Sequence, residues 1–200
     1  MKKIITSILI CISLFASGQV QFNGSEIGVE VFAAKAGTNG GTIGFGLKYA
    51  AILNKNFAFG PSFRYNRTWN FSNENYDGPV SSGNLYGGGF YAHARYQDAI
   101  FGGVEFELIK TPFDFSQPSG EFKPWVATLF IGGGFSKLYN KVRINLGIFY
   151  DVINAENSPF RPNYAVRIKN TDGGTQRILP IIYRINFFFP IGNNKDKKDK

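Results

Sequence analysis

The chain has 200 residues and a formal net charge of +8, with 16% aromatic and 18% charged residues and 24 glycines. A length of this order suits one domain, and a single histidine and a single cysteine exclude any multi-histidine or multi-cysteine metal site. The basic balance is spread along the chain, so it favours contact with anionic lipid surfaces over nucleic acid. We predict no metal, no cofactor and no nucleic-acid partner.

The first residues have the pattern of a secretory signal peptide. Two lysines precede an apolar run, residues 4–15, which is too short to span a membrane as a helix, and residues 16–18 are small, as a signal peptidase requires. We expect cleavage after Gly18. Cys11 lies inside the apolar run and would be removed with it, which excludes disulfides and a cysteine nucleophile from the mature chain.

Eight later segments alternate between apolar residues and small or polar residues, a period of two that predicts β-strands with two different faces. They cover residues 26–33, 42–51, 57–71, 86–96, 100–109, 125–136, 142–151 and 179–189. Each is near the ~9–11 residues with which a tilted strand crosses a bilayer.

The connections between these segments alternate in length. Asn54–Asn56, Gln97–Ala99 and Tyr139–Lys141 are expected tight turns, whereas the other connections are long, polar and rich in Gly, Pro, Asn and Ser. Short turns at one end and long loops at the other are typical of outer-membrane barrels, and an even strand count places both termini on the short-turn, periplasmic side.

The last long connection is expected to hold structure of its own. Tyr164, Val166 and Ile168 alternate there, and we expect the final strand to extend outward and pair with this segment. Pro61 and Pro180 each lack a backbone N–H, so we predict a bulge or a local break in the sheet at both.

The pattern predicts an all-β fold, an eight-stranded antiparallel up-and-down transmembrane β-barrel; a secreted lipocalin-like barrel is the alternative. Most strand glycines fall on the polar face, which indicates a cramped interior rather than a solvated surface. We expect residues 19–191 to form this one domain, followed by a charged periplasmic tail at 192–200.

Aromatic residues on the apolar face cluster at the strand ends, with aliphatic residues between them, as in the two interfacial girdles of a membrane barrel. The expected girdle residues are Phe57, Phe59, Trp69, Phe71, Tyr86, Tyr96, Trp125, Phe135, Tyr150, Phe187 and Phe189.

Charges on the polar face balance near mid-height of the strands. Three acids and three bases are expected there, and a buried charge must find a partner. This lumenal charge cluster consists of Glu30, Lys48, Arg64, Glu105, Glu107 and Arg184. We interpret it as a structural filling of the lumen; a gated ion path is the alternative.

The signal peptide, the eight amphipathic strands and the final aromatic strand IIYRINFFFPI together resemble the OmpX/OmpA-type small outer-membrane β-barrels, and in particular the outer-membrane β-barrel domain proteins of Bacteroidota-type bacteria. The resemblance implies a location in a Gram-negative outer membrane, contact with membrane lipids and lipopolysaccharide, and a terminal strand read by the barrel-assembly machinery. Phe189 is followed by eleven residues, which departs from the pattern of a strictly terminal aromatic residue.

The function predicted from these features is non-catalytic: a structural, surface-interaction or complex-subunit role in the cell envelope, with an unidentified protein partner possible in the last case. The alternatives are a narrow, porin-like pore or accessory subunit of an export or assembly complex, and a lipid A acyl-modifying hydrolase. The hydrolase would need a serine near His93, the only histidine, and Ser136 is the lumenal candidate. We predict no catalytic residue and interpret His93 as a hydrogen-bonding residue of the lumen.

Overall fold

A computed structural model describes residues 21–37, 40–69, 83–111, 124–155, 157–161, 164–169 and 175–191. The described chain forms strands β1 (Phe22–Gly37), β2 (Gly40–Leu53), β3 (Phe57–Trp69), β4 (Gly83–Tyr96), β5 (Ile100–Lys110), β6 (Trp125–Tyr139), β7 (Val142–Asp151), β8 (Val166–Lys169), β9 (Thr175–Leu179) and β10 (Ile181–Ile191). The expected signal peptide and the expected charged tail lie outside the described residues.

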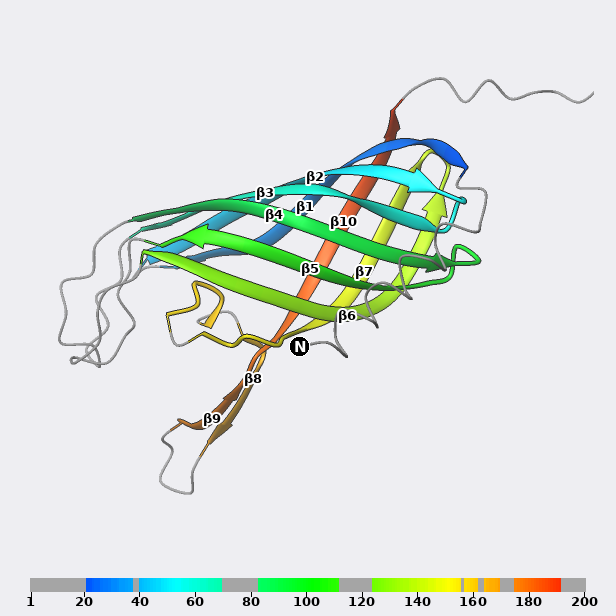
Figure 1. Cartoon of the computed structure of the whole chain (residues 1–200). Coiled ribbons are helices and arrows are strands. Elements are labelled where there is room, and N and C mark those ends of the chain that lie inside the picture. Colours follow the sequence, from blue (N-terminus) through cyan, green and yellow to red (C-terminus); the bar gives the residue numbers. More distant parts are fainter. Residues whose placement is uncertain are drawn as a thin grey trace, which may run out of the picture.

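Eight of these strands form a closed antiparallel barrel in the order β1-β10-β7-β6-β5-β4-β3-β2, as Figure 1 shows. The seam is closed by β1 and β10, which pair from Ser25 with Ile191 to Val31 with Ile185. The predicted eight-stranded antiparallel up-and-down barrel is therefore confirmed. Several strands are longer than the predicted spans, because hairpin pairing continues past the expected ends, as in β1 and β2, which pair as far as Gly37 and Gly40.

No helix among the described segments has the length and apolar character needed to cross a membrane.

The short connections are tight turns that lie together at one end of the barrel. In the turns after β2 and β4, Asn56 donates to the carbonyl of Leu53 over 3.2 Å and Ala99 donates to that of Tyr96 over 3.0 Å. Both central residues of each turn have positive φ, between 48° and 61°. This is the type I′ geometry, whose twist matches that of the flanking strands. The turn between β6 and β7 contains only Asn140 and Lys141. Tyr139, expected in this turn, is instead the last residue of β6.

Both prolines interrupt the sheet. Opposite Pro61 the β2–β3 pairing is broken between the Lys48–Ser62 pair and the Ala51–Phe59 pair, without a change of register. Pro180 separates β9 from β10. The predicted local breaks are confirmed. The first hairpin has two register shifts, neither at a proline: one between Phe22 and Ser25 and one between Phe32 and Lys35. Gly24, inside the first, has a φ of +112°, in a region that side-chain-bearing residues rarely adopt.

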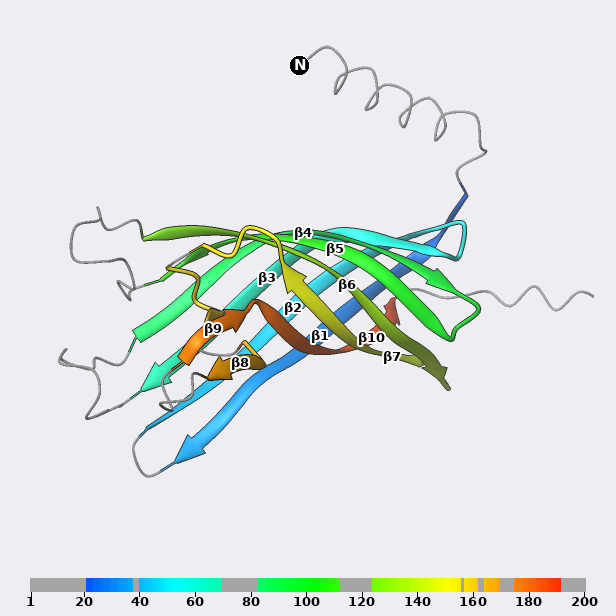
Figure 2. The same ribbon diagram turned by 90° about the horizontal axis from the view of Figure 1, so that it is seen from below.

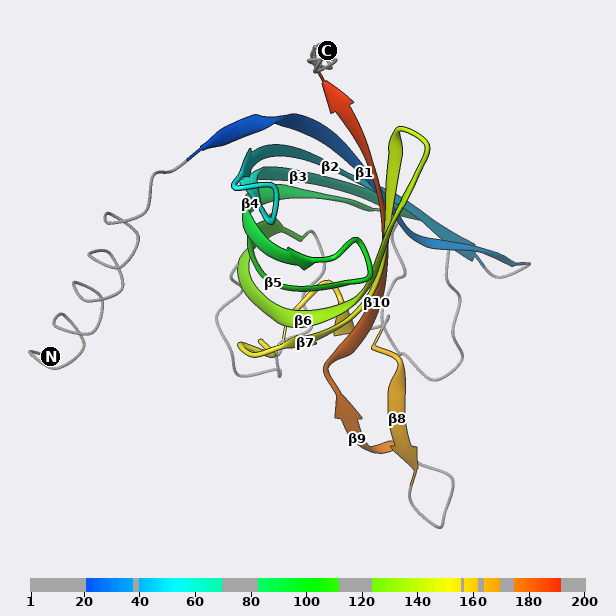
Figure 3. The ribbon, with the colours of Figure 1, turned by 90° about the vertical axis from the view of Figure 1, so that its right-hand side faces the viewer.

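The last long connection contains the predicted pairing. Strand β9, the outward extension of β10, pairs antiparallel with β8, from Val166 with Leu179 to Lys169 with Thr175. This two-stranded sheet projects from the side of the barrel (Figures 2 and 3). Of the described residues between β7 and β8, Ser158, Pro159, Phe160 and Tyr164 are instead buried at the end of the barrel opposite the tight turns.

Glycines on the inward face make room for aromatic rings. A Cβ built at Gly28 would lie 2.6 Å from the ring of Phe188. A Cβ at Gly103 would lie 2.3 Å from the ring of His93 and 2.9 Å from a backbone oxygen. Real Cβ atoms essentially never lie this close to another heavy atom. The inward rings of Phe188 and His93 therefore fit only because the residues beside them on the neighbouring strands are glycines, which have no side chain.

Two adjacent glycines test this account. Gly103→Ala is expected to destabilise the barrel by about 1–3 kcal/mol, because the added methyl group overpacks a filled interior. Gly102→Ala is the matched control, because its Cβ would lie 3.8 Å from the nearest atom, and it is expected to be neutral or slightly stabilising. Urea unfolding in lipid vesicles, followed by tryptophan fluorescence, measures both. Equal stability of the two variants would contradict the account.

Candidate functional site

The barrel has an apolar outside and a polar inside. Along β5 the residues alternate between exposed and buried, with Val104, Phe106 and Leu108 outward and Glu105 and Glu107 inward. Large hydrophobic residues are exposed on every strand of the barrel. The usual arrangement of a water-soluble protein is reversed, and the chemistry of the site is therefore in the lumen.

The expected girdle residues lie on the outward face where their side chains are described. Those near the tight turns are Phe57, Phe59, Tyr96, Phe135, Phe187 and Phe189, and those near the other end are Tyr86, Trp125 and Tyr150. Tyr86 and Trp125 contact each other edge to face, with centroids 6.3 Å apart. The side chain of Trp69 and the whole of Phe71 lie outside what the structure describes.

The structure brings all six residues of the lumenal charge cluster together, and each is at most 3% exposed. The Lys48 ammonium lies 2.9 Å from Glu30 and 2.8 Å from Glu105. Asn186 accepts a further hydrogen bond from it over 3.0 Å. Strands β1, β2, β5 and β10 thus meet at one lysine in the middle of the lumen.

The two arginines complete the network. Arg64 holds Glu107 in a two-pronged contact, with Nε 3.0 Å from Oε2 and Nη2 2.8 Å from Oε1, and its Nη1 lies 3.0 Å from Glu30. Arg184 Nη1 donates to Glu105 Oε2 and lies 3.4 Å from Glu107. Such forked contacts with a carboxylate constrain the guanidinium in orientation as well as in distance.

The cluster is balanced in charge, with three carboxylates facing three cations. An unpaired charge would be strongly disfavoured in this water-poor interior, whereas each charge here has at least two partners of opposite sign. Gly46 lies beside Glu30 on the neighbouring strand, and a Cβ there would approach that of Glu30 to 3.2 Å. The backbone is therefore shaped to admit the cluster.

His93 extends the cluster on the side of the tight turns. Its Nε2 lies 2.8 Å from Glu105 Oε1, and the ring is 1% exposed. Tyr91 and Phe101 approach it with centroids 5.0 and 5.1 Å away. Ser136, the candidate partner for a hydrolase, accepts a hydrogen bond from Arg143 over 3.2 Å. The histidine is held inside the barrel as a hydrogen-bonding residue, away from the rims.

Two further ion pairs lie near the tight turns. Arg95 contacts Glu26 over 2.8 Å, and Arg143 contacts Asp98 over 2.5 Å. The ring of Phe188 lies between the centre and this end, with the Arg95 guanidinium carbon 4.9 Å from its centroid. Within the part of the chain that the structure describes, no group of three or more His, Cys, Asp or Glu side chains is arranged to hold a metal ion.

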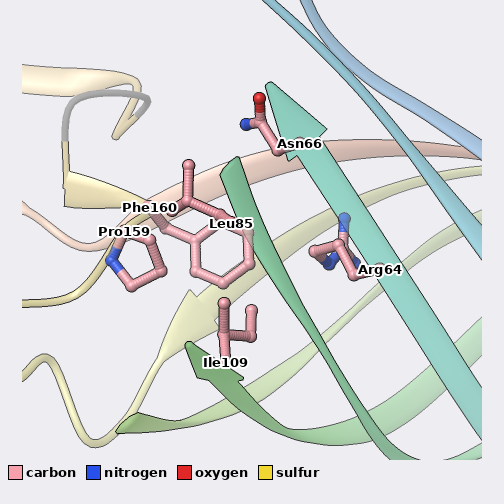
Figure 4. Close-up of a pocket in the computed structure, with 6 residues that line it drawn as sticks. All are labelled: Arg64, Asn66, Leu85, Ile109, Pro159 and Phe160. Atoms are coloured by element: carbon pink, nitrogen blue, oxygen red, sulfur yellow. The ribbon is translucent and has the colours of Figure 1, made fainter. Parts of the chain in front are cut away.

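At the opposite end, residues 158–160, which follow β7, fill the lumen. Phe160 is 3% exposed and packs edge to face on Phe130, with centroids 5.0 Å apart and planes at 89°. Its ring also lies over the charge cluster, 5.3 Å from the guanidinium carbon of Arg64. A small pocket remains beside it, and Figure 4 shows its lining of Arg64, Asn66, Leu85, Ile109, Pro159 and Phe160.

Tyr164 anchors this segment to the barrel wall. Its hydroxyl donates to Asp151 Oδ2 over 2.8 Å, and Asp151 Oδ1 accepts hydrogen bonds from the backbone N–H groups of Ile153 and Asn154. Tyrosine keeps its proton at neutral pH, and burial raises the pKa of the Tyr164 hydroxyl further, so this hydroxyl is the donor of the bond. Asp151 thus ties the end of β7 to the loop that plugs the lumen.

Sequence reasoning did not predict Phe160, Tyr164 or Asp151 as parts of the site. A single phenylalanine in a long polar connection has no periodicity to mark it. The contact between Glu105 and His93 could not be predicted either, because it depends on the register with which β4 pairs with β5. The six charges could be predicted because each alternates with outward apolar neighbours.

No family model matches the chain, and no curated protein sequence matches it. Among solved structures, the Yersinia pestis outer membrane protein Ail in a phospholipid bilayer nanodisc is similar, with 14% sequence identity and a TM-score of 0.46; the match covers 84% of this chain and 100% of that one. The fold and site together define the chain as a closed eight-stranded β-barrel with an apolar outside and an ion-paired lumen.

Removing one member of the cluster tests its contribution to stability. Glu105→Ala is expected to cost about 3–5 kcal/mol of unfolding free energy, because it leaves Lys48 and Arg184 short of a buried partner. Asp98→Ala is the control: its side chain is 53% exposed, so loss of its ion pair should cost about 0–1 kcal/mol. Urea unfolding in lipid vesicles compares them. A cost for Glu105→Ala no larger than that of the control would contradict a structural cluster.

Proposed function

We propose that the chain is an integral outer-membrane β-barrel with a filled lumen, and that it acts as a structural, surface-interaction or subunit protein of the envelope. One observation carries the proposal: every strand of the barrel exposes large hydrophobic side chains, while the six charges of the lumenal cluster are enclosed. Phe90 and Phe135, outward on β4 and β6, are 69% and 71% exposed. Water-soluble proteins rarely expose apolar patches beyond a few hundred Å².

The closed barrel fits a lipid environment for a second reason. Backbone groups in hydrocarbon must be paired within the protein, and closure leaves the spanning region without a free edge. Rings on the outward face near both ends of the strands fit the two interfaces of a bilayer. The predicted signal peptide supplies a route across the inner membrane, and we propose that the ends of β1 and β10, which lie with the tight turns, face the periplasm. Lipopolysaccharide and phospholipids are the proposed lipid partners, with the barrel-assembly machinery acting during insertion.

The filled lumen supports a non-conducting and non-catalytic role. Lys48, Arg64 and Arg184 reach across the centre to carboxylates on other strands, and Phe160 covers them from one end. A narrow barrel of eight strands has an interior that side chains can just fill. His93 is enclosed by rings and bound to Glu105, which supports a packing role over catalysis.

The membrane assignment predicts a resistant barrel. The unboiled protein is expected to migrate differently from the boiled protein on a denaturing gel, because the closed sheet resists detergent. It is also expected to remain with the membrane after alkaline carbonate extraction. Identical migration together with release by carbonate would contradict an integral barrel.

The filled lumen predicts no ion conductance. Planar bilayers containing the wild-type protein should show no discrete current steps, since the cluster blocks the centre. Barrels that show the gel shift but conduct would instead favour the pore alternative.

Lipid A mass spectra are expected to be unchanged when the gene is deleted, and a change in acyl chain number would favour the hydrolase.

A further inference from the structure

The hairpin of β6 and β7 extends past its neighbours at the end of the barrel that has the tight turns. Strand β6 pairs with β5 only as far as Phe135, which is opposite Ile100. Among the described residues, 137–139 pair with β7 alone. Figure 3 shows this hairpin, in yellow-green, standing away from the ring of strands. We call residues 137–141 the hairpin tip.

In a bilayer, the hairpin tip belongs outside the hydrocarbon region. No described strand pairs with residues 137–139 on the side of β5, and backbone groups without partners are not tolerated in hydrocarbon. Phe135, exposed on the outward face just before the tip, belongs to the expected aromatic girdle at this end. Lys137 follows about 7 Å further along the strand, which places it at the depth of the lipid phosphates.

The hairpin tip is basic and aromatic. Lys137 and Tyr139 alternate onto the outward face of β6, Lys141 follows in the turn, and all three are exposed. Neither lysine forms an ion pair with a residue that the structure describes, whereas Arg143, at the base of the hairpin, is paired with Asp98. The tip therefore presents two uncompensated positive charges beside an amphipathic ring.

We propose that the hairpin tip binds the headgroup of an anionic phospholipid in the leaflet at this end, which is the periplasmic leaflet in the proposed orientation. Lys137 and Lys141 attract the phosphate, and the Tyr139 ring lies at the interface, where tyrosine is favoured. A zwitterionic headgroup carries its own ammonium beside the phosphate, which offsets this attraction. A lysine at a free strand edge also opposes the addition of another strand, so a lipid fits this edge better than a peptide does. The inference rests on the proposed membrane location and adds a lipid preference at one site.

Lipid binding to the full-length mature barrel in nonionic detergent tests the site, with native mass spectrometry to count bound lipids. The probes are dioctanoyl phosphatidylglycerol, which is anionic, and dioctanoyl phosphatidylcholine, which is zwitterionic. Wild type is expected to bind the glycerol lipid at least about tenfold more tightly. Lys137→Gln and Lys141→Gln are each expected to weaken that binding about fivefold and to leave binding of the choline lipid unchanged. Equal affinity of wild type for the two lipids would overturn the proposal.

Lys55→Gln is the matched control. Lys55 is an exposed turn lysine at the same end, but its turn joins β2 and β3, on the other side of the barrel from β6 and β7. Its loss is expected to leave the affinity for phosphatidylglycerol nearly unchanged. A loss as large as that of the tip variants would indicate diffuse attraction and overturn a local site. Every variant is first shown to have the gel shift of a folded barrel, so a barrel without lipid preference contradicts this site and leaves the membrane assignment intact.

Discussion

The balance of charge inside a narrow barrel is the constraint on which the rest of the structure depends. Eight strands enclose an interior just wide enough for side chains, so every inward charge must be paired by another inward residue. Lys48, Arg64 and Arg184 satisfy this by reaching carboxylates on other strands. The cluster therefore joins strands that are distant in sequence, and it supplies polar contacts across the lumen where backbone pairing cannot.

Crowding at the centre explains the features around it. Rings fill the lumen on both sides of the cluster, and glycines such as Gly28 and Gly103 stand where a ring needs the space. Phe160 completes the filling at one end and contacts the cluster directly. On the outside, where no polar partner is offered, the side chains are large and apolar. The two faces of each barrel strand therefore differ in composition: the outward face is apolar, and the inward face carries the polar and charged side chains.

Much of the fold could be predicted from the sequence, because a period of two reports directly which residues share a face. The same alternation identified the six charges as inward residues, and the prolines marked the breaks. The details it could not predict depend on register and on loops. Glu105 meets His93 only once β4 and β5 are aligned, and Phe160 acts through a non-periodic segment that folds back into the barrel.

The most direct test of the central claim is a double-mutant cycle on Arg64 and Glu107, joined by the forked contact at 3.0 and 2.8 Å. Each residue is replaced by leucine, singly and together, and unfolding free energies are measured in lipid vesicles. Each single change should cost about 3–5 kcal/mol. The double change should cost clearly less than the sum, with a coupling energy of about 2–3 kcal/mol. Additive costs, with a coupling energy near zero, would contradict a lumen held together by its ion pairs.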